Sequence, residues 1–314
     1  MPTLGLITNP ASSKDIRRLT GLARVVDVEE KANLVARLLA GVGSVDGLSV
    51  IALDDRSGLV RRAVRLAGSS APPVELLDVE AEGTEADTRR AAARLATFAV
   101  EALVVVGGDG TVRAAAEGWP GARLVPLAAG TNNAFALTDE PTVVGLAAAL
   151  AVTGDMAAFT PTTAVTVETS DGTAVAVIDA IAVRDRWIGS GAIWDPDRMV
   201  EGLVTSARRT AVGLASVSAA FGPLQTGHAR WIRFGGTTTV RAVFGPGLVC
   251  DVPVAEHRDV PIGASMPISG EAGLVALDGE RRLPAAGGRA TVIAGPRVLD
   301  PVIAFSSSLG RTTR

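Results

Sequence analysis

Apolar segments alternate with helix-forming segments over the first 140 residues, and this alternation constrains the fold more than any other feature of the chain. The apolar segments lack the polar alternation of a half-exposed strand, so we expect strands that are buried on both faces. A parallel sheet covered by helices on both sides satisfies that pattern. We expect strands at residues 4–8, 48–53, 74–79, 103–106 and 124–128, and helices at 29–39, 59–66 and 85–100.

The pattern changes near residue 140. One more helix is expected at 143–152, after which β-branched segments separated by glycines follow at short intervals, as is typical of antiparallel sandwiches. The expected strands are 164–168, 174–183, 231–234, 237–244, 274–277 and 289–293, with a helical insertion at about 198–220. The predicted fold is therefore a three-layer α/β domain (1–140), an all-β sandwich-like domain (141–298) and a tail (299–314) that can return to the first domain.

Three glycines surround one carboxylate where the predicted strand 103–106 ends. They are Gly107, Gly108 and Gly110, and the carboxylate is Asp109. Glycine leaves no Cβ in the way of a ligand, and the helix expected next offers unpaired amides and the positive end of its dipole. A tight turn alone would explain one or two glycines, but not an acid among three. The segment therefore predicts a phosphate-binding turn.

Two further polar segments also follow predicted strands. Asn9 comes directly after strand 4–8, and the loop 130–133 comes soon after strand 124–128. Ligands of open parallel sheets bind at the carboxyl ends of the strands, so both segments can meet the glycine turn at one edge. The residues alone thus predict one phosphate site at that edge.

Several segments together resemble the superfamily of the NAD kinases and diacylglycerol kinases. Residues 107–111 resemble its GGDGT signature, 5–10 its opening strand with Asn-Pro, 130–136 the GTxNDFA loop of the lipid kinases, and 278–280 its DGE or DGQ element. Within the superfamily, residues 9–18 followed by 30–33 are most similar to bacterial ATP-NAD kinase-like proteins found beside acetoin-catabolism genes. The resemblance thus extends over nearly the whole chain.

The resemblance implies an active site between the two domains and the transfer of a phosphoryl group from ATP, with Mg²⁺, to a hydroxyl. NAD is the favoured acceptor, and NADP is then the product. Such a reaction needs charge neutralisation, alignment and a route for the acceptor proton. Asp109 is implied as the base, and its carboxylate can also bind Mg²⁺ through a water.

Nucleotide contacts are implied for a larger group of residues: Asn9, Gly107, Gly108, Gly110, Thr111, Gly130, Thr131, Asn132, Asn133 and Glu280. Each polar member also has a structural alternative. Thr111 can simply start the helix, and the asparagines can serve a turn or a helix cap. Glu280 follows Leu277-Asp278-Gly279, which is also a hairpin-turn signal.

The acceptor half of the site departs from the family patterns. Ala134 replaces the acid of the lipid-kinase loop, which argues against a lipid acceptor. The Asn-Glu pair with which NAD kinases hold the dinucleotide has Ile178-Asp179 as its nearest match, so Asp179 is the predicted acceptor-binding residue. A lipid or other small-molecule kinase, and a nucleotide-binding regulator with weak turnover, therefore stay open as alternatives.

Charge and composition restrict the partners. A net charge of −3 supplies no basic field for nucleic acid or for an anionic membrane. The single Cys250 cannot form an internal disulfide, and two histidines are too few for a His-based zinc site.

Segment 210–227 is uncharged but weakly apolar, so we expect the end of a buried helix and no membrane span. Because no signal peptide is visible at the N-terminus, we expect a cytoplasmic protein. We also expect it to be a homo-oligomer.

Overall fold

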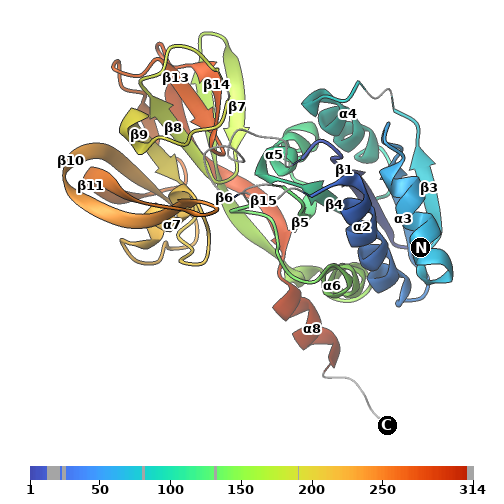
Figure 1. Cartoon of the computed structure of the whole chain (residues 1–314). Coiled ribbons are helices and arrows are strands. Elements are labelled where there is room, and N and C mark those ends of the chain that lie inside the picture. The colour runs from blue at the N-terminus through green and yellow to red at the C-terminus, as the bar shows by residue number, and fades with distance from the viewer. Residues whose placement is uncertain (13–21, 23–25, 80–81, 131–132, 190, 310–314) are drawn as a thin grey trace.

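The computed structural model describes residues 1–12, 22, 26–79, 82–130, 133–189 and 191–309. They form two β-sheets with surrounding helices (Figure 1). The first sheet runs, in spatial order, through β3 (Val74–Leu77), β2 (Ser49–Leu53), β1 (Thr3–Thr8), β4 (Ala102–Gly107), β5 (Arg123–Ala128), β15 (Arg289–Leu299), β6 (Phe159–Thr169) and β7 (Gly172–Ala176), with β12 (Ser265–Pro267) paired to β15.

The second sheet is antiparallel. It runs through β11 (Leu248–Pro261), β10 (His228–Gly245), β9 (Met199–Val204), β8 (Asp179–Val183), β13 (Leu274–Leu277) and β14 (Glu280–Pro284). The α-helices are α2 (Val28–Gly43), α3 (Leu59–Ala67), α4 (Glu85–Leu95), α5 (Asp109–Gly118), α6 (Pro141–Thr153), α7 (Leu214–Ala219) and α8 (Pro301–Leu309).

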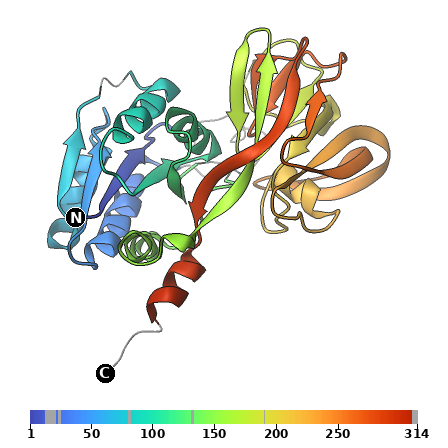
Figure 2. The same cartoon turned by 180° about the vertical axis from the view of Figure 1, so that it is seen from behind.

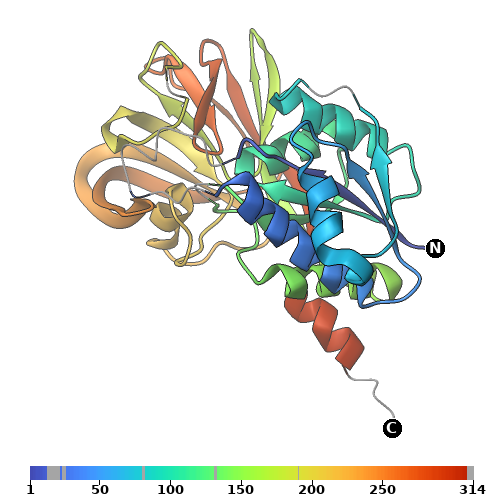
Figure 3. The same cartoon turned by 45° about the vertical axis from the view of Figure 1, so that its right-hand side comes forward.

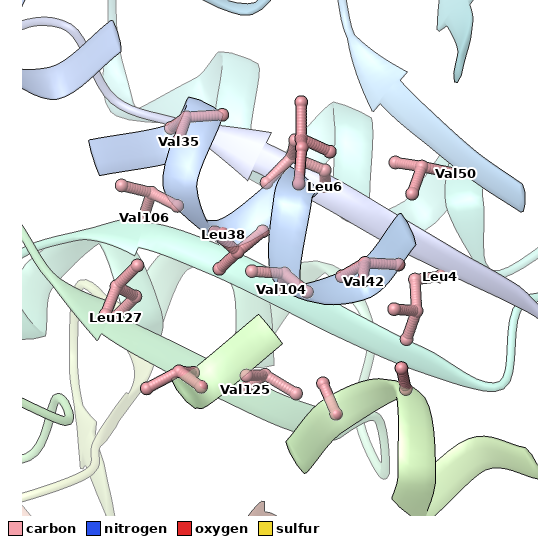
Figure 4. Packing of buried hydrophobic residues seen from close by; sticks show 14 of the residues in the cluster. Leu4, Leu6, Val35, Leu38, Val42, Val50, Val104, Val106, Val125 and Leu127 are labelled. Carbon is pink, nitrogen blue, oxygen red and sulfur yellow. The ribbon is translucent and has the colours of Figure 1, made fainter. Parts of the chain in front are cut away.

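Strands β1 to β5 form a parallel sheet between two layers of helices. On β4, Val104 and Val106 pack with α2, α3 and α6, whereas Leu103 and Val105 pack with α4 and α5. The first of these cores is seen in Figure 4, and α2 and α3 lie side by side over it in Figure 3. Because both faces are covered, these strands are continuous apolar runs, as the sequence predicts.

The order of the parallel strands reverses between β1 and β4. From β1 the chain moves outward through β2 and β3, and then returns to place β4 on the other side of β1. Such a reversal opens a crevice at the carboxyl ends of the two strands, where α/β sheets bind ligands. Asn9 follows β1 and Gly108 follows β4, so both lie at this point.

Strands β6 and β15 extend the first sheet into the second half of the molecule (Figure 2). At one end β15 pairs with β5, and it pairs with β6 along nearly its whole length. At the other end, Val165 and Val292 pack against Leu203 and Val275 of the second sheet. The two sheets therefore form a sandwich there, which confirms the predicted class of an α/β domain followed by an antiparallel β-domain.

The prediction of a helical insertion at about 198–220 is wrong for its first part. Residues 199–204 form strand β9 inside the second sheet, and only 214–219 form a helix, α7. Residues 174–183, expected as one strand, form parts of β7 and β8 in different sheets. The expected strands 231–234 and 237–244 are one long strand, β10, which is bent where its pairing with β11 shifts register.

Helix α8 returns to the first half of the molecule, where Ala304 joins the core formed with α2 and α6. No helix of the described residues is long and apolar enough to cross a membrane. The domain boundaries near residues 140 and 298 stay predictions, since β6 and β15 belong to the same sheet as the first five strands.

Candidate active site

The glycine turn connects β4 to α5. Gly108 is the N-cap of α5, with φ −96° and ψ 178°, and its carbonyl accepts the N–H groups of Thr111 (2.9 Å) and Val112 (3.2 Å). Gly107, Gly108 and Gly110 are not among the described glycines with positive φ, so left-handed backbone is not what requires them.

Two of the glycines of the site are needed because other atoms of the protein lie too close to leave room for a Cβ. A Cβ on Gly107 would lie 2.5 Å from Oγ1 of Thr111, and a Cβ on Gly130 would lie 2.7 Å from Cα of Gly108. At Gly108 and Gly110 the nearest atoms would be 3.6 Å and 3.7 Å away, which is ordinary contact. The latter two positions therefore have room beside the backbone.

Asn9 joins the end of β1 to the start of α5. Its Nδ2 donates to Oγ1 of Thr111 (2.9 Å), and its Oδ1 accepts the N–H of Ala11 (2.9 Å). The buried ammonium of Lys31 donates to the carbonyl oxygens of Pro10 (2.8 Å) and Ser12 (2.6 Å). These bonds hold the loop after β1 against the crevice.

Gly130 and Asn133 lie opposite the glycine turn. Nδ2 of Asn133 donates to the carbonyl of Gly130 (2.9 Å), while its buried Oδ1 has no hydrogen-bond partner among the described residues. That oxygen lies 3.8 Å from the position a Cβ would take on Gly108. An unsatisfied buried acceptor beside an open glycine suits a ligand donor group. The predicted contacts of Thr131 and Asn132 fall outside the described residues.

The carboxylate of Asp109 holds the segment after this loop. It is 7% exposed and accepts the N–H groups of Ala134 (2.7 Å), Phe135 (3.0 Å) and Ala136 (3.3 Å). Asp109 therefore has a structural function in addition to the chemical one predicted for it.

Three aspartates line one small pocket between the two halves of the molecule. Asp109 comes from α5, Asp179 from β8, and Asp278 from the turn between β13 and β14. The pocket has a volume of about 30 Å³, room for a water molecule or two. Val212, Gly213 and Leu214 close its other side.

The turn that carries Asp278 is bound tightly to β8. Oδ1 of Asp278 accepts the N–H groups of Val177 (2.9 Å) and Ile178 (2.8 Å), and Oδ1 of Asp179 accepts the N–H of Gly279 (3.1 Å). Asp278 has a φ of 51° and is the only described residue other than glycine with positive φ. The hairpin turn between β13 and β14 is thus the one that the Asp-Gly pair in the sequence indicates.

Burial raises the pKa of the Asp278 carboxyl to about 7. The guanidinium of Arg113 and two backbone donors oppose the shift, and the nearby carboxylate of Asp109 adds to it. The carboxyl of Asp278 therefore keeps its proton to higher pH than an exposed aspartate does, and it can exchange that proton near neutral pH.

Arg113, one turn into α5, connects the two halves. Its side chain is 1% exposed, and its Nη1 lies 3.6 Å from Oδ2 of Asp278 and donates to the carbonyl of Leu277 (3.3 Å). Its Nη2 pairs with Glu85 (3.1 Å). Burial raises the pKa of Glu85, but Arg113 and Arg282 lower it by more, so the net direction is down.

The sequence-predicted residues of the described chain meet at one place. Asn9 bonds Thr111, Gly108 faces Gly130, and Asp109 shares a pocket with Asp179. The carboxylate of Glu280 pairs with Arg282 and lies 3.9 Å from the position a Cβ would take on Gly110.

Sequence reasoning missed two residues, Arg113 and Asp278. An arginine within the apolar run after the glycine turn was the available signal for Arg113. The sequence places Asp278 in the DGE element and in a hairpin turn but gives it no role in the site, because its contacts are with residues about a hundred positions away.

Magnesium would have to be held jointly with a ligand. Among the residues that the structure describes, no group of three or more His, Cys, Asp or Glu side chains is arranged to hold a metal ion. Mg²⁺ is commonly bound by one or two carboxylates together with substrate phosphates and water. Asp109 and Asp179 in one pocket fit that requirement.

Two family models match consecutive parts of the chain. The model of the diacylglycerol kinase catalytic domain matches residues 54–159, and that of the acetoin catabolism protein X C-terminal domain matches residues 163–295. Two solved structures from Bacillus anthracis str. Sterne, a diacylglycerol kinase and a putative one, align at TM-scores of 0.47 and 0.46 with 12% and 11% identity. Each alignment covers 96% of this chain and 98% of the other.

A relative in Cupriavidus necator, the acetoin catabolism protein X of that organism, is 33% identical over 302 residues. The alignment covers 90% of this chain and 84% of the relative. The first half of the chain thus carries a kinase-like catalytic domain. The chain belongs to the acetoin catabolism protein X family, within the superfamily of the NAD kinases and diacylglycerol kinases.

Proposed function

We propose that this protein transfers a phosphoryl group from ATP, with Mg²⁺, to the hydroxyl of a small molecule, and that the acceptor is NAD. The carrying observation is that the glycine turn meets Gly130, Asn133 and two predicted acids at the crevice between β1 and β4. Phosphoryl transfer depends mainly on positioning and charge compensation, which such a site can supply. The kinase-like domain supports the reaction class.

The donor nucleotide is assigned to the α5 side. The first amides of α5 and the open faces of Gly108 and Gly110 would receive its phosphates. Asn133, with its unsatisfied oxygen, would bind a donor group of the nucleotide. Glu280 and the Asn9–Thr111 pair flank the same helix end.

The acceptor hydroxyl is assigned to the pocket of the three aspartates. Asp109 would take its proton, and Asp179 would bind ribose hydroxyls of NAD, in the position where NAD kinases carry an acid. Mg²⁺, when bound, supplies charge compensation, and Asp109 and Asp179 would hold it. Because the pocket has room for little more than water, acceptor binding would require the residues that line it to move apart.

A phosphoryl-transfer screen with labelled ATP tests the proposal. In the presence of Mg²⁺, the purified protein should transfer the label from ATP to NAD. It should transfer less label, or none, to NADH, nucleosides and diacylglycerol. Labelled diacylglycerol in place of NAD would identify a lipid kinase. ATP binding by calorimetry without any labelled acceptor would identify a nucleotide-binding regulator, and absence of ATP binding would refute the proposal.

Asp179→Asn tests the acceptor assignment. The variant keeps an oxygen for the N–H of Gly279 but loses the charge, so we expect the KM for NAD to rise about tenfold, the effect of one charged hydrogen bond. The KM for ATP should change little. An unchanged KM for NAD with an unchanged melting temperature would remove Asp179 from the acceptor site.

A cytoplasmic location and a homo-oligomeric state also remain proposals from the sequence.

A further inference from the structure

Lys31 is buried in the first turn of α2, where it is only 1% exposed. Taking an ammonium out of water is costly unless its donors are hydrogen-bonded, so a buried lysine needs partners that the fold holds in place. Because α2 follows β1 of the parallel sheet, its first turn lies at the carboxyl edge of that sheet, beside the crevice. Lys31 is therefore placed to act on the loop that carries Asn9.

The ammonium of Lys31 holds the backbone of this loop. Its Nζ donates to the carbonyl oxygens of Ser12 (2.6 Å) and Pro10 (2.8 Å), and more distantly to that of Asn9 (3.4 Å). Two of these oxygens belong to the peptide groups that directly follow Asn9. Lys31 thus fixes the backbone on the C-terminal side of a residue that is predicted to contact the nucleotide.

The peptide group between Pro10 and Ala11 is held from both ends. Lys31 binds its oxygen, and its N–H donates to Oδ1 of Asn9 (2.9 Å). Because a peptide group is planar, a fixed oxygen also fixes the direction of the N–H. The bond from Ala11 occupies Oδ1 of Asn9 and leaves Nδ2 of the same amide for Thr111. Lys31 therefore orients the side chain of Asn9 through one peptide group.

Asn9 in turn decides how the hydroxyl of Thr111 is used. Its Nδ2 donates to Oγ1 of Thr111 (2.9 Å), so the hydroxyl is an acceptor in this bond and its proton points elsewhere. Within the described part of the chain, no acceptor receives that proton. Thr111 lies in the first turn of α5, where the phosphates of the donor nucleotide are assigned. Its O–H is thus available to a phosphate oxygen.

We propose that Lys31 is a positioning residue for the phosphates of ATP: by orienting Asn9, it keeps the hydroxyl of Thr111 as a donor toward a phosphate oxygen. This inference rests on the proposed function, because it requires ATP phosphates at the start of α5. Lys31 acts through Asn9 and Thr111 and does not itself contact the nucleotide.

Lys31→Met tests the proposal, because methionine keeps most of the side-chain length and removes all three N–H donors. Calorimetry with ATP and Mg²⁺ should show an affinity about tenfold lower than that of the wild type, the effect of one hydrogen bond to a charged group. Adenosine, which has no phosphate, should bind the two proteins equally. Unchanged ATP affinity in the folded variant, or an equal loss for adenosine, would overturn the proposal.

A double-mutant cycle tests the route through Thr111. Thr111→Val removes the hydroxyl and keeps the shape of the side chain. If Lys31 acts through that hydroxyl, Lys31→Met should weaken ATP binding about tenfold in the wild type but less than about twofold in Thr111→Val. A lysine that only stabilised the loop would give the same loss in both backgrounds, and that result would refute the proposal.

Two further variants keep the test decisive. Arg37→Met removes a cation from the same helix, but the side chain of Arg37 is 53% exposed and pairs with Glu140 (2.7 Å), so ATP affinity should not change. An equal loss in Arg37→Met would attribute the effect to the charge of α2 and overturn the positional role of Lys31. If Lys31→Met does not fold, Lys31→Gln replaces it, since glutamine is too short to reach the three carbonyl oxygens, and the same losses are expected.

ATP binding by the wild type separates this inference from the proposed function. If the wild type does not bind ATP, the proposed function fails and this inference fails with it. If the wild type binds ATP and folded Lys31→Met binds it equally well, only the role of Lys31 is refuted.

Discussion

At the scale of single residues, the two oxygens of Asp109 are central to both structure and chemistry. They accept three backbone N–H groups from residues 134–136 and also face the pocket shared with Asp179 and Asp278. The first set of bonds orients the carboxylate rigidly. A base that is held in this way loses little entropy when it engages an acceptor hydroxyl.

Asp109→Asn tests the chemical role of this residue. The amide keeps one oxygen for the backbone donors but cannot take a proton, so we expect kcat to fall by about 10²–10⁴ while ATP still binds. Steady-state kinetics and ATP calorimetry measure the two effects. Turnover at the wild-type rate would show that another carboxylate is the base, and Asp278 would be the next candidate.

Gly108→Ala tests the phosphate-binding turn, with Gly107→Ala as its matched control. An added Cβ at Gly108 meets nothing closer than 3.6 Å in the protein, so the fold should be kept while bound phosphate is obstructed. We expect ATP affinity to fall at least about tenfold. Gly107→Ala should instead lower the melting temperature, since its Cβ would lie 2.5 Å from Thr111. Unchanged ATP affinity in folded Gly108→Ala would contradict the assignment.

For single residues, the sequence predicts a functional role only where the residues next to them in the chain form a recognisable pattern. The glycine turn and Asn9 are recognisable because each follows a strand, and Asp179 is recognisable only through the resemblance to the Asn-Glu pair of the NAD kinases. Arg113 and Asp278 owe their importance to a contact between residues more than 160 positions apart, and no local pattern encodes it.

At the scale of helices and strands, α2 and α6 are in contact through glycine. A Cβ on Gly41 would lie 2.2 Å from the carbonyl oxygen of Thr142, and one on Gly145 would lie 2.1 Å from that of Leu38. The two backbones therefore approach more closely than side chains would permit. This crossing fixes α6 over the same face of the sheet as α2.

Gly145→Ala should consequently destabilise the protein by about 1–3 kcal/mol, the usual cost of an overpacked core. Urea unfolding measures the free energy. Gly270→Ala is the control, because a Cβ there would meet no atom within 4 Å and the residue is not among those with positive φ. Equal stability of both variants would mean that the helices shift apart without cost.

The helices and strands of the first half are predictable because each is specified by a pattern in its own stretch of sequence. Strands buried on both faces are continuous apolar runs, and helices such as α4 begin at a recognisable cap, here Thr84 with Asp87. In the second half, strand β9 is part of a predicted helical region, and β10 bends through a register shift. The bounds and bends of those strands depend on the strands they pair with, and the local sequence does not reveal which strands pair.

At the scale of the whole molecule, one buried ion pair joins the two halves. Arg113 of α5 lies 3.6 Å from Asp278 of the β13–β14 turn, and both side chains are essentially inaccessible to water. Burial leaves Asp278 with a pKa of about 7, although Arg113 opposes that shift. The connection between the halves is therefore sensitive to pH.

The sign of this sensitivity follows from linkage. In the unfolded chain Asp278 has an ordinary carboxyl pKa of about 4, so between about pH 4 and pH 7 the folded protein holds a proton that the unfolded chain has lost. This contribution to stability is complete at low pH and is lost as pH rises toward 7. We expect the free energy of unfolding of the wild type to fall over that range.

Asp278→Asn isolates this effect. Asparagine tolerates the left-handed backbone at φ 51° and keeps an acceptor for the backbone donors, but it does not titrate. Urea unfolding of both proteins between about pH 5 and pH 8 should show that the difference in stability changes in favour of the variant as pH rises. Parallel pH profiles would mean that Asp278 titrates normally in the folded protein.

Strands β6 and β15 give the molecule a mechanical property. They are paired to one another from the core beneath α6 to the sandwich with the second sheet, and their pairing is interrupted between Ala294 and Arg297, at Gly295 and Pro296. A rotation of one half against the other would have to twist both strands together, which a single-chain linker would not require. Gly295 and Pro296, where the pairing is interrupted, are the place at which such a twist would disturb the fewest paired residues.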